Sequence, residues 1–144
     1  MRPVLYACLL FTFLAPACKK DGGPGNASLF GKWKMIDYTN GFTGQTIAIP
    51  ADSSCYLLLT SDGTYGQQVK GTVEFGTYNI IVVNSIFNRQ SRAIQLTSPA
   101  TASGIPLLYE IHKDTLNLYM NVYDGNAYRY ISAPGGLHPS NGRP

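Results

Sequence analysis

From residue 29 to residue 132 the chain repeats one pattern, in which short segments of strand-forming residues are separated by turn-forming residues. Leu116 and Leu118 alternate with polar neighbours, as residues do in a strand with one buried face. Asp124-Gly125 is a dipeptide typical of tight hairpins. No segment has the 3.6-residue periodicity of an amphipathic helix. The pattern predicts an all-β domain with strands at residues 31–38, 55–60, 64–69, 73–83, 92–97, 107–112, 116–123 and 127–132.

Strands that follow one another through hairpins, with no crossover helices between them, form an antiparallel meander. An open meander leaves two strand edges unpaired, and closure into a barrel removes both edges. We therefore predict an eight-stranded antiparallel up-and-down barrel, with a two-sheet β-sandwich as the alternative, because its sequence pattern is similar. The strand at 73–83 is long enough to need a bend, and Gly76 is the expected bulge or kink.

The alternation along each strand also predicts which side chains point into the barrel. Trp33 is expected to close one end of the interior with its large apolar ring system. Val122 and Ile111 are expected to point inward with the apolar face of the strands that carry them. If the interior holds a ligand, the residues expected to contact it are Met35, Leu59, Tyr65, Tyr78, Tyr109, Leu118 and Met120.

The outer face is expected to carry aromatic residues. Tyr119 and Tyr123 would form an exposed stripe together with neighbouring asparagines, a composition that suits recognition of sugars or protein. The alternative is plain cross-strand pairing with Tyr128 and Tyr130 of the last strand. Arg129, between those two tyrosines, is expected either to point inward against a carboxylate or to stack outside over a ring.

The N-terminus has the layout of a secretory signal peptide. Arg2 gives a positively charged start, residues 4–14 are apolar, and residues 15–17 are small. The apolar run is too short for a membrane-spanning helix, which needs roughly 20 residues. Cys18 follows the small residues and resembles the cysteine of a bacterial lipobox, which receives lipid and becomes the mature N-terminus. Cys18 is therefore the expected lipidation site.

These signals divide the chain into four parts. Residues 1–17 are the expected signal peptide, and residues 18–28 are the lipidated cysteine with a flexible tether rich in glycine. Residues 29–132 form the barrel, and residues 133–144 are expected to be a disordered tail. The expected location is the bacterial cell envelope, with the lipid in a membrane, most simply the outer membrane.

Four segments resemble a known family. Residues 29–33 (LFGKW) resemble the Gly-X-Trp opening of lipocalins, and residues 59–65 (LTSDGTY) are similar to the second-strand hairpin of lipocalin-like domains in bacterial lipoproteins, especially those of Bacteroidetes. Residues 76–80 (GTYNI) and 114–118 (DTLNL) resemble later strands of the same domains, in the same order. The resemblance implies a lipocalin-like barrel at the cell envelope. It implies no particular activity.

Charge and cysteine content narrow the function classes. A net charge of +3 at pH 7 is too small to indicate a nucleic-acid partner. Cys8 lies in the signal peptide and Cys18 would carry lipid, so Cys55 has no partner for a disulfide. Within its apolar segment Cys55 is expected to be a buried, unreactive thiol.

The sequence contains no motif that predicts catalysis. His112 and His138 have no further ligand at metal-binding spacing. Glu74 and Glu110 are the two glutamates, both are expected to point outward, and nothing pairs them as the acid and base of a glycosidase. We predict a protein that is not an enzyme and uses neither a metal nor a cofactor.

Two binding functions remain. The first is capture of a small apolar or amphipathic molecule inside the barrel, with the membrane as the second partner through the N-terminal lipid. The alternative is a non-catalytic accessory protein that uses its outer face or loops to bind protein or glycan. The volume of the barrel interior distinguishes the two functions. Ligand pockets measure roughly 300–1,000 Å³, and a fully packed interior leaves no such space.

Overall fold

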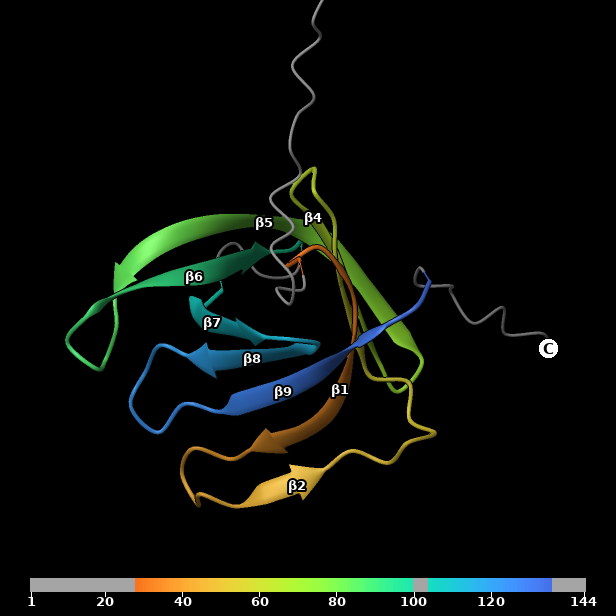
Figure 1. Cartoon of the computed structure of the whole chain (residues 1–144), viewed down its shortest axis with the longest axis horizontal. Helices are drawn as coiled ribbons and strands as arrows, with labels where there is room; N and C mark the ends of the chain where they lie inside the picture. Colours follow the sequence, from red (N-terminus) through yellow and green to blue (C-terminus); the bar gives the residue numbers. More distant parts are fainter. Residues whose placement is uncertain (1–27, 100–103, 136–144) are drawn as a thin grey trace, which may run out of the picture.

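The computed structural model describes residues 28–99 and 104–135. It has nine strands and, within those residues, no helix, so none there is long and apolar enough to cross a membrane. The signal peptide, Cys18 and nearly all of the expected tether lie outside the described residues, as does most of the expected tail. The strands are β1 (Gly31–Thr39), β2 (Thr46–Ala48), β3 (Tyr56–Leu59), β4 (Thr64–Val69), β5 (Thr72–Asn84), β6 (Gln90–Thr97), β7 (Leu107–His112), β8 (Thr115–Met120) and β9 (Ala127–Ala133) (Figure 1).

Eight of the strands close into an antiparallel barrel, which confirms the predicted fold class and sets aside the sandwich. The order around the barrel is β1-β3-β4-β5-β6-β7-β8-β9, and β9 pairs back onto β1 along seven residue pairs. The eight strands follow the order of the sequence around the barrel, with β2 left out between β1 and β3, and the closing pair joins the first strand to the last. This is an up-and-down barrel with no open sheet edge among these eight strands.

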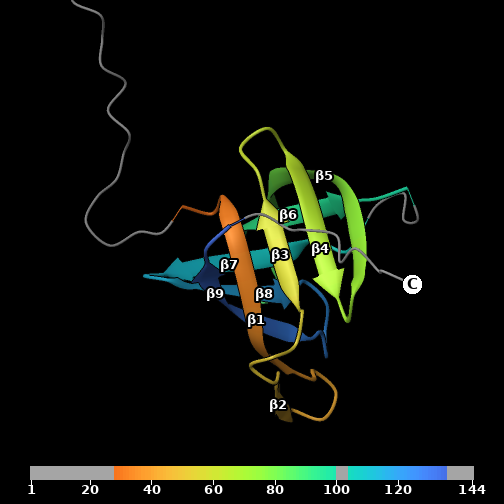
Figure 2. The ribbon, with the colours of Figure 1, turned by 90° about the vertical axis from the view of Figure 1, so that its right-hand side faces the viewer.

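The extra strand, β2, is a short ribbon on one edge of β1. The first half of β1 pairs with β3 at residues 31–34, and β2 pairs with β1 at residues 37–39. β2 therefore pairs with the same edge of β1 as β3 does, further along β1. Figure 2 shows β2 at the C-terminal end of β1. The sequence prediction lacked this strand because its three residues are all exposed and show no alternation of burial.

Of the bulge or kink expected at Gly76, the bulge is not present, whereas the expected bend of β5 is (Figure 1). The ladder between β4 and β5 runs through Gly76 without a register shift, and β5 then exchanges β4 for β6 as its partner at Thr77 while it curves (Figure 1). Glycine is needed here because of a close approach, since a Cβ at Gly76 would lie 2.2 Å from the carbonyl oxygen of Thr97 and 2.6 Å from Cε1 of Tyr65. Glycine at this position allows the close approach of Thr97 and Tyr65, and no extra residue is inserted into the strand.

The irregularity lies instead in β1, opposite β9. Met35 pairs with Tyr130 and Asp37 pairs with Arg129, so Ile36 is the extra residue of a β-bulge. The bulge reverses which residues of β1 face inward. Met35 faces the interior with Tyr130, whereas Asp37 shares the outer face with Arg129.

Strand β8 ends at Met120, earlier than predicted, because Asn121 binds two other segments. Its backbone N–H donates to the carbonyl of Pro106 at 3.1 Å. Its side-chain oxygen accepts from the N–H of Ile86 at 2.9 Å, and its side-chain nitrogen donates to the carbonyl of Asn84 at 3.2 Å. Asn121 therefore joins the hairpin between β5 and β6 to the end of β8.

The structure differs from what the sequence predicted for the side chains at the end of β8. Tyr123 and Val122 lie in the loop after the strand, so Val122 is not part of the inward alternation, and Tyr123 is 83% exposed and forms no stripe with Tyr119. The cross-strand pairing proposed as the alternative is also wrong. Tyr128 pairs with Leu118, Tyr130 with Leu116, and Tyr119 with Ala127.

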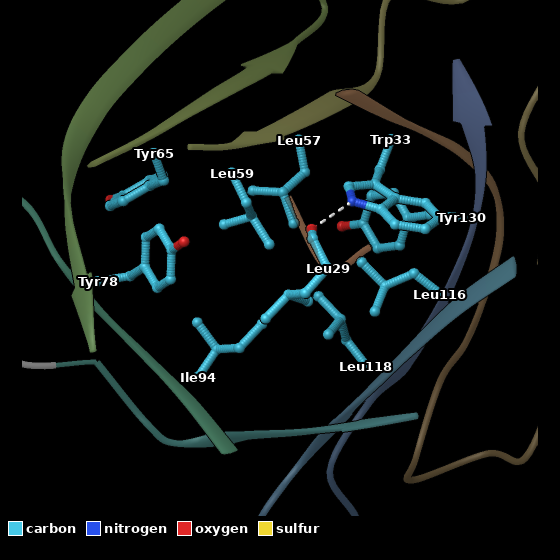
Figure 3. Close-up of a cluster of buried hydrophobic side chains, with 10 residues drawn as sticks. All are labelled: Leu29, Trp33, Leu57, Leu59, Tyr65, Tyr78, Ile94, Leu116, Leu118 and Tyr130. Atoms are coloured by element: carbon cyan, nitrogen blue, oxygen red, sulfur yellow. Dashed lines mark hydrogen bonds between the residues drawn. The ribbon is translucent and has the colours of Figure 1, made fainter. Parts of the chain in front are cut away.

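The core fills one part of the barrel interior. Trp33 is 1% exposed, and its indole N–H donates to the carbonyl oxygen of Leu29 at 2.9 Å. Leu29 precedes β1 and is itself buried, so the chain is fixed to the core before the first strand begins. Figure 3 shows the buried cluster, which consists of Leu29, Trp33, Leu57, Leu59, Tyr65, Tyr78, Ile94, Leu116, Leu118 and Tyr130.

Candidate ligand-binding site

A cavity of about 280 Å³ lies inside the barrel beside the packed core. Its size is close to the lower end of the range for ligand pockets, roughly 300–1,000 Å³. Seven of the eight barrel strands contribute inward-facing side chains to its wall. The lining residues are Met35, Leu57, Gln67, Leu96, Ile105, Leu107, Leu118, Met120, Tyr128 and Tyr130.

Register explains why these side chains meet. Leu118 pairs with Tyr109 on β7 and with Tyr128 on β9, and Met120 pairs with Leu107. Paired residues in an antiparallel ladder point to the same face of the sheet. The inward face of β8 therefore continues across both neighbouring strands and forms one wall of the cavity.

The polar groups of the cavity wall are few. The hydroxyl of Tyr128 donates to the sulfur of Met120 at 3.9 Å and lies 3.4 Å from the side-chain nitrogen of Asn126. Gln67 contributes an amide, and Tyr130 contributes a phenol. None of the lining residues is charged, so the wall is apolar with a small number of hydrogen-bonding groups.

Tyr130 lies where the cavity meets the core. It is 4% exposed, and burial raises the pKa of its phenol well above the ordinary value. The phenol is therefore neutral throughout the physiological range. Cys55 is buried nearby, as predicted, and its carbonyl accepts a hydrogen bond from the N–H of Met35 at 2.9 Å.

The structure divides the seven predicted contact residues into three groups. Met35, Leu118 and Met120 line the cavity. Leu59, Tyr65 and Tyr78 belong to the packed core and do not line it. Tyr109 shares the inward face of Leu118, is half-buried against that core, and lines a different cleft, beside the start of β6.

Tyr78 has a structural role in the hairpin between β3 and β4. Its backbone N–H donates to the carbonyl of Gly63 at 2.7 Å, and its hydroxyl donates to the carbonyl of Thr60. Burial raises the pKa of Tyr78 and also that of Tyr65. Both phenols are therefore neutral at physiological pH.

Several lining residues were absent from the sequence prediction. Gln67 lies two residues after Tyr65 in β4, so the alternation could have assigned it to the same inward face. Leu107 could have been found by the same reasoning from Tyr109. Ile105 precedes β7 in a segment without periodicity, so no sequence signal placed it at the cavity.

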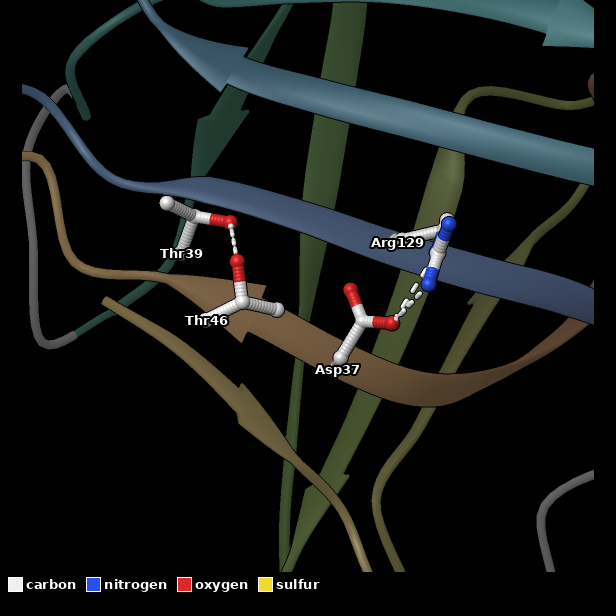
Figure 4. Close-up of polar contacts among 4 residues, drawn as sticks. All are labelled: Asp37, Thr39, Thr46 and Arg129. Carbon is white, nitrogen blue, oxygen red and sulfur yellow. Dashed lines mark hydrogen bonds and ion pairs between the residues drawn. The ribbon is translucent and has the colours of Figure 1, made fainter. Parts of the chain in front are cut away.

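Arg129 pairs with a carboxylate, but on the outer face of the barrel. Its Nε donates to Oδ2 of Asp37 at 3.0 Å, and its Nη2 donates to the same oxygen (Figure 4). Next to this pair, the hydroxyls of Thr39 and Thr46 are 2.9 Å apart and join β1 to β2. These contacts fasten the strands at the bulge, outside the cavity, so neither the inward position nor the stacked position expected for Arg129 is found.

No group of three His, Cys, Asp or Glu side chains within residues 28–99 and 104–135 is placed to hold a metal ion. Comparison with known proteins gives no relative, since no family model, no curated protein and no solved structure matches the chain. The barrel agrees with a lipocalin-like fold, and membership of that lipoprotein family stays a prediction from the four sequence motifs.

Proposed function

We propose that the protein binds one small, mostly apolar molecule in the barrel cavity and is held at the bacterial cell envelope by lipid on Cys18. The observation that supports this most strongly is a cavity of about 280 Å³ with a largely apolar wall, inside an otherwise packed barrel. Burial of apolar ligand surface contributes roughly 25 cal/mol per Å². The role is binding, without a catalytic step.

The wall defines the chemistry of the ligand. Leu57, Leu96 and Leu118 offer an apolar surface, and the side chains of Met35 and Met120 adapt to irregular shapes. A buried charge on the ligand would have no charged partner in this wall, and its desolvation would oppose binding. The ligand is therefore neutral inside the barrel. A charged head group on an amphipathic ligand would have to remain in solvent.

The polar groups of the wall fix one end of the ligand. The amide of Gln67 and the hydroxyl of Tyr128 can each donate and accept a hydrogen bond. A single hydroxyl, carbonyl or amide on the ligand could form hydrogen bonds with both of these groups. A pure hydrocarbon would offer no hydrogen bond to the amide of Gln67 or to the hydroxyl of Tyr128, so a ligand with one neutral polar group fits better.

Native mass spectrometry of the protein purified from its own host tests the proposal. The wild type should carry a bound species of small, constant mass, which organic extraction releases. The Leu118→Trp variant should lack that species, because the larger ring fills the cavity from a position on its wall. A bound species of equal occupancy in the variant would place the ligand elsewhere, and a bare mass in both proteins would contradict ligand capture.

A further inference from the structure

A second cleft lies where β6 and β7 separate, and it shares no lining residue with the barrel cavity. Their ladder has two residue pairs, Ala93 with Leu108 and Ile94 with Leu107, whereas β7 and β8 share six. Before Ala93, the start of β6 diverges from β7. A cleft of about 550 Å³ opens there between the β5–β6 hairpin and the strands β7 and β8. This volume suits a ligand the size of a sugar or a small drug.

The hairpin that forms one wall is held by hydrogen bonds. The N–H of Ser85 donates to the carbonyl of Arg89, and the N–H of Asn88 donates to the carbonyl of Ser85, both at 2.9 Å. The side chain of Asn121 binds the same hairpin at Asn84 and Ile86. The wall is therefore fixed before any ligand arrives, which reduces the entropy cost of binding.

The cleft contains an arginine that has no acidic partner among the described residues. Arg92 lies with its guanidinium carbon 5.8 Å from the centre of the Tyr109 ring, and in the described part of the chain it forms no ion pair. Arg89 faces Glu110 at 3.6 Å, and both of these side chains are largely exposed. The three charged side chains leave one net positive charge in the cleft.

Aromatic rings and hydroxyl groups form the rest of the lining. Phe87 is 61% exposed at the tip of the hairpin, and Tyr119 is half-buried on the opposite wall. Burial, followed by the charge of Glu110, raises the pKa of Tyr119, so its hydroxyl remains a hydrogen-bond donor at neutral pH. Gln90 and Ser91 add further donors and acceptors.

We propose that this cleft binds an acidic monosaccharide unit, a pyranose ring that carries a carboxylate. The guanidinium of Arg92 would take the carboxylate, the match for which a planar guanidinium is best suited. The carboxylate of Glu110 would accept hydrogen bonds from ring hydroxyls. The apolar face of the sugar would rest on an aromatic side chain.

The charged groups of the cleft disfavour three related kinds of ligand. A neutral sugar offers no carboxylate to Arg92, and a flat aromatic acid offers no hydroxyl donors to Glu110. A ligand with several negative charges would meet repulsion from Glu110. The proposal concerns a cleft with its own lining residues and a charged ligand, so it is independent of the barrel cavity and its neutral ligand.

NMR titration of the isotopically labelled protein with D-glucuronate tests the proposal, with D-glucose and benzoate as matched probes. Glucuronate should shift the amide signals of residues 87–92 and 108–110, with an affinity roughly tenfold or more above that of either probe, the ratio expected from one charge-assisted interaction. Equal binding of glucose or benzoate would overturn the assignment. So would shifts confined to the barrel cavity, or no shifts at millimolar glucuronate.

Two variants locate the carboxylate site. Arg92→Gln should weaken glucuronate binding roughly tenfold or more while the amide spectrum outside the cleft stays that of the wild type. Lys70→Asn removes the same charge from the β4–β5 turn, where the backbone φ of 49° suits asparagine, and should leave binding unchanged. Equal weakening by both variants would show a general effect of charge and would refute a site at Arg92.

Discussion

Trp33 donates its indole N–H to the carbonyl oxygen of Leu29 at 2.9 Å, and both side chains are buried. Gly31 lies between them with a φ of 145°, in the region that favours glycine. The chain thus turns at Gly31, so that the ring of Trp33 reaches back to the residue that leads into the barrel. This contact gives a physical reason for the Gly-X-Trp motif at the start of β1.

Trp33→Ala should lower the free energy of unfolding by roughly 3–5 kcal/mol, the range for removal of a large buried aromatic side chain. Trp33→Phe should cost less, because it keeps an aromatic ring and loses the hydrogen bond to Leu29 with part of the volume. Chemical denaturation of the three proteins measures both effects. A denaturation midpoint for Trp33→Ala equal to that of the wild type would show that the ring does not support the core.

Stability should decline as the pH rises above 10. Burial raises the folded-state pKa of Tyr130 far above its ordinary value of 10.0. Above pH 10 the unfolded chain therefore releases a proton that the folded chain keeps, so unfolding becomes more favourable. Below pH 10 this contribution is fully present. Unfolding free energies measured on both sides of pH 10 should fall less steeply for Tyr130→Phe than for the wild type, and parallel curves would contradict this account.

Asp62 should titrate below its ordinary pKa of 3.8, because the hydroxyl of Thr60 and then that of Thr64 donate hydrogen bonds to its carboxylate. Any stability from this group is present above pH 3.8 and declines as the pH falls through the lowered pKa. In Thr60→Val, NMR titration of the Asp62 carboxyl should give a pKa closer to 3.8. Thr72→Val, at the exposed start of β5, serves as the control and should leave the Asp62 pKa unchanged.

Replacement of Cys18 by serine should move the protein from the membrane fraction to the soluble fraction of its host. An acyl chain contributes about 0.8 kcal/mol of membrane affinity per buried CH₂ group, and serine cannot form the thioether that carries it. Cys55→Ser changes a buried thiol without touching the anchor and should leave the protein in the membrane fraction. Equal partitioning of wild type and Cys18→Ser would contradict the lipoprotein assignment.

The period-2 alternation was enough to predict the barrel, because apolar and polar residues alternate along a strand that has one buried face. Leu116 and Leu118 show this, since both are fully buried, and Asn117 between them is not. Local exceptions were not predictable in the same way. The bulge at Ile36 follows from pairing with β9, which is distant in sequence. The end of β8 follows from the contacts of Asn121 with Asn84, Ile86 and Pro106.

The candidate cavity was predicted less completely than the fold. Alternation assigns Leu59 and Met35 equally to the interior, yet Leu59 is packed in the core and Met35 borders the cavity. Where a space remains depends on the combined volumes of side chains from seven strands, and a single sequence does not reveal that sum. The cleft between β6 and β7 depends on the angle at which β6 leaves β7, which is again a tertiary property.

The central claim is that the barrel cavity, and not the outer face, holds the apolar ligand. Leu118→Trp and Met120→Trp each fill the cavity from its wall, and Tyr119→Ala changes the intervening residue, which points to the other side of β8. The neutral fluorescent probe N-phenyl-1-naphthylamine should bind the wild type and Tyr119→Ala with equal affinity and lose binding in both tryptophan variants. Probe binding that survives both tryptophan variants, or that disappears in Tyr119→Ala alone, would contradict the account.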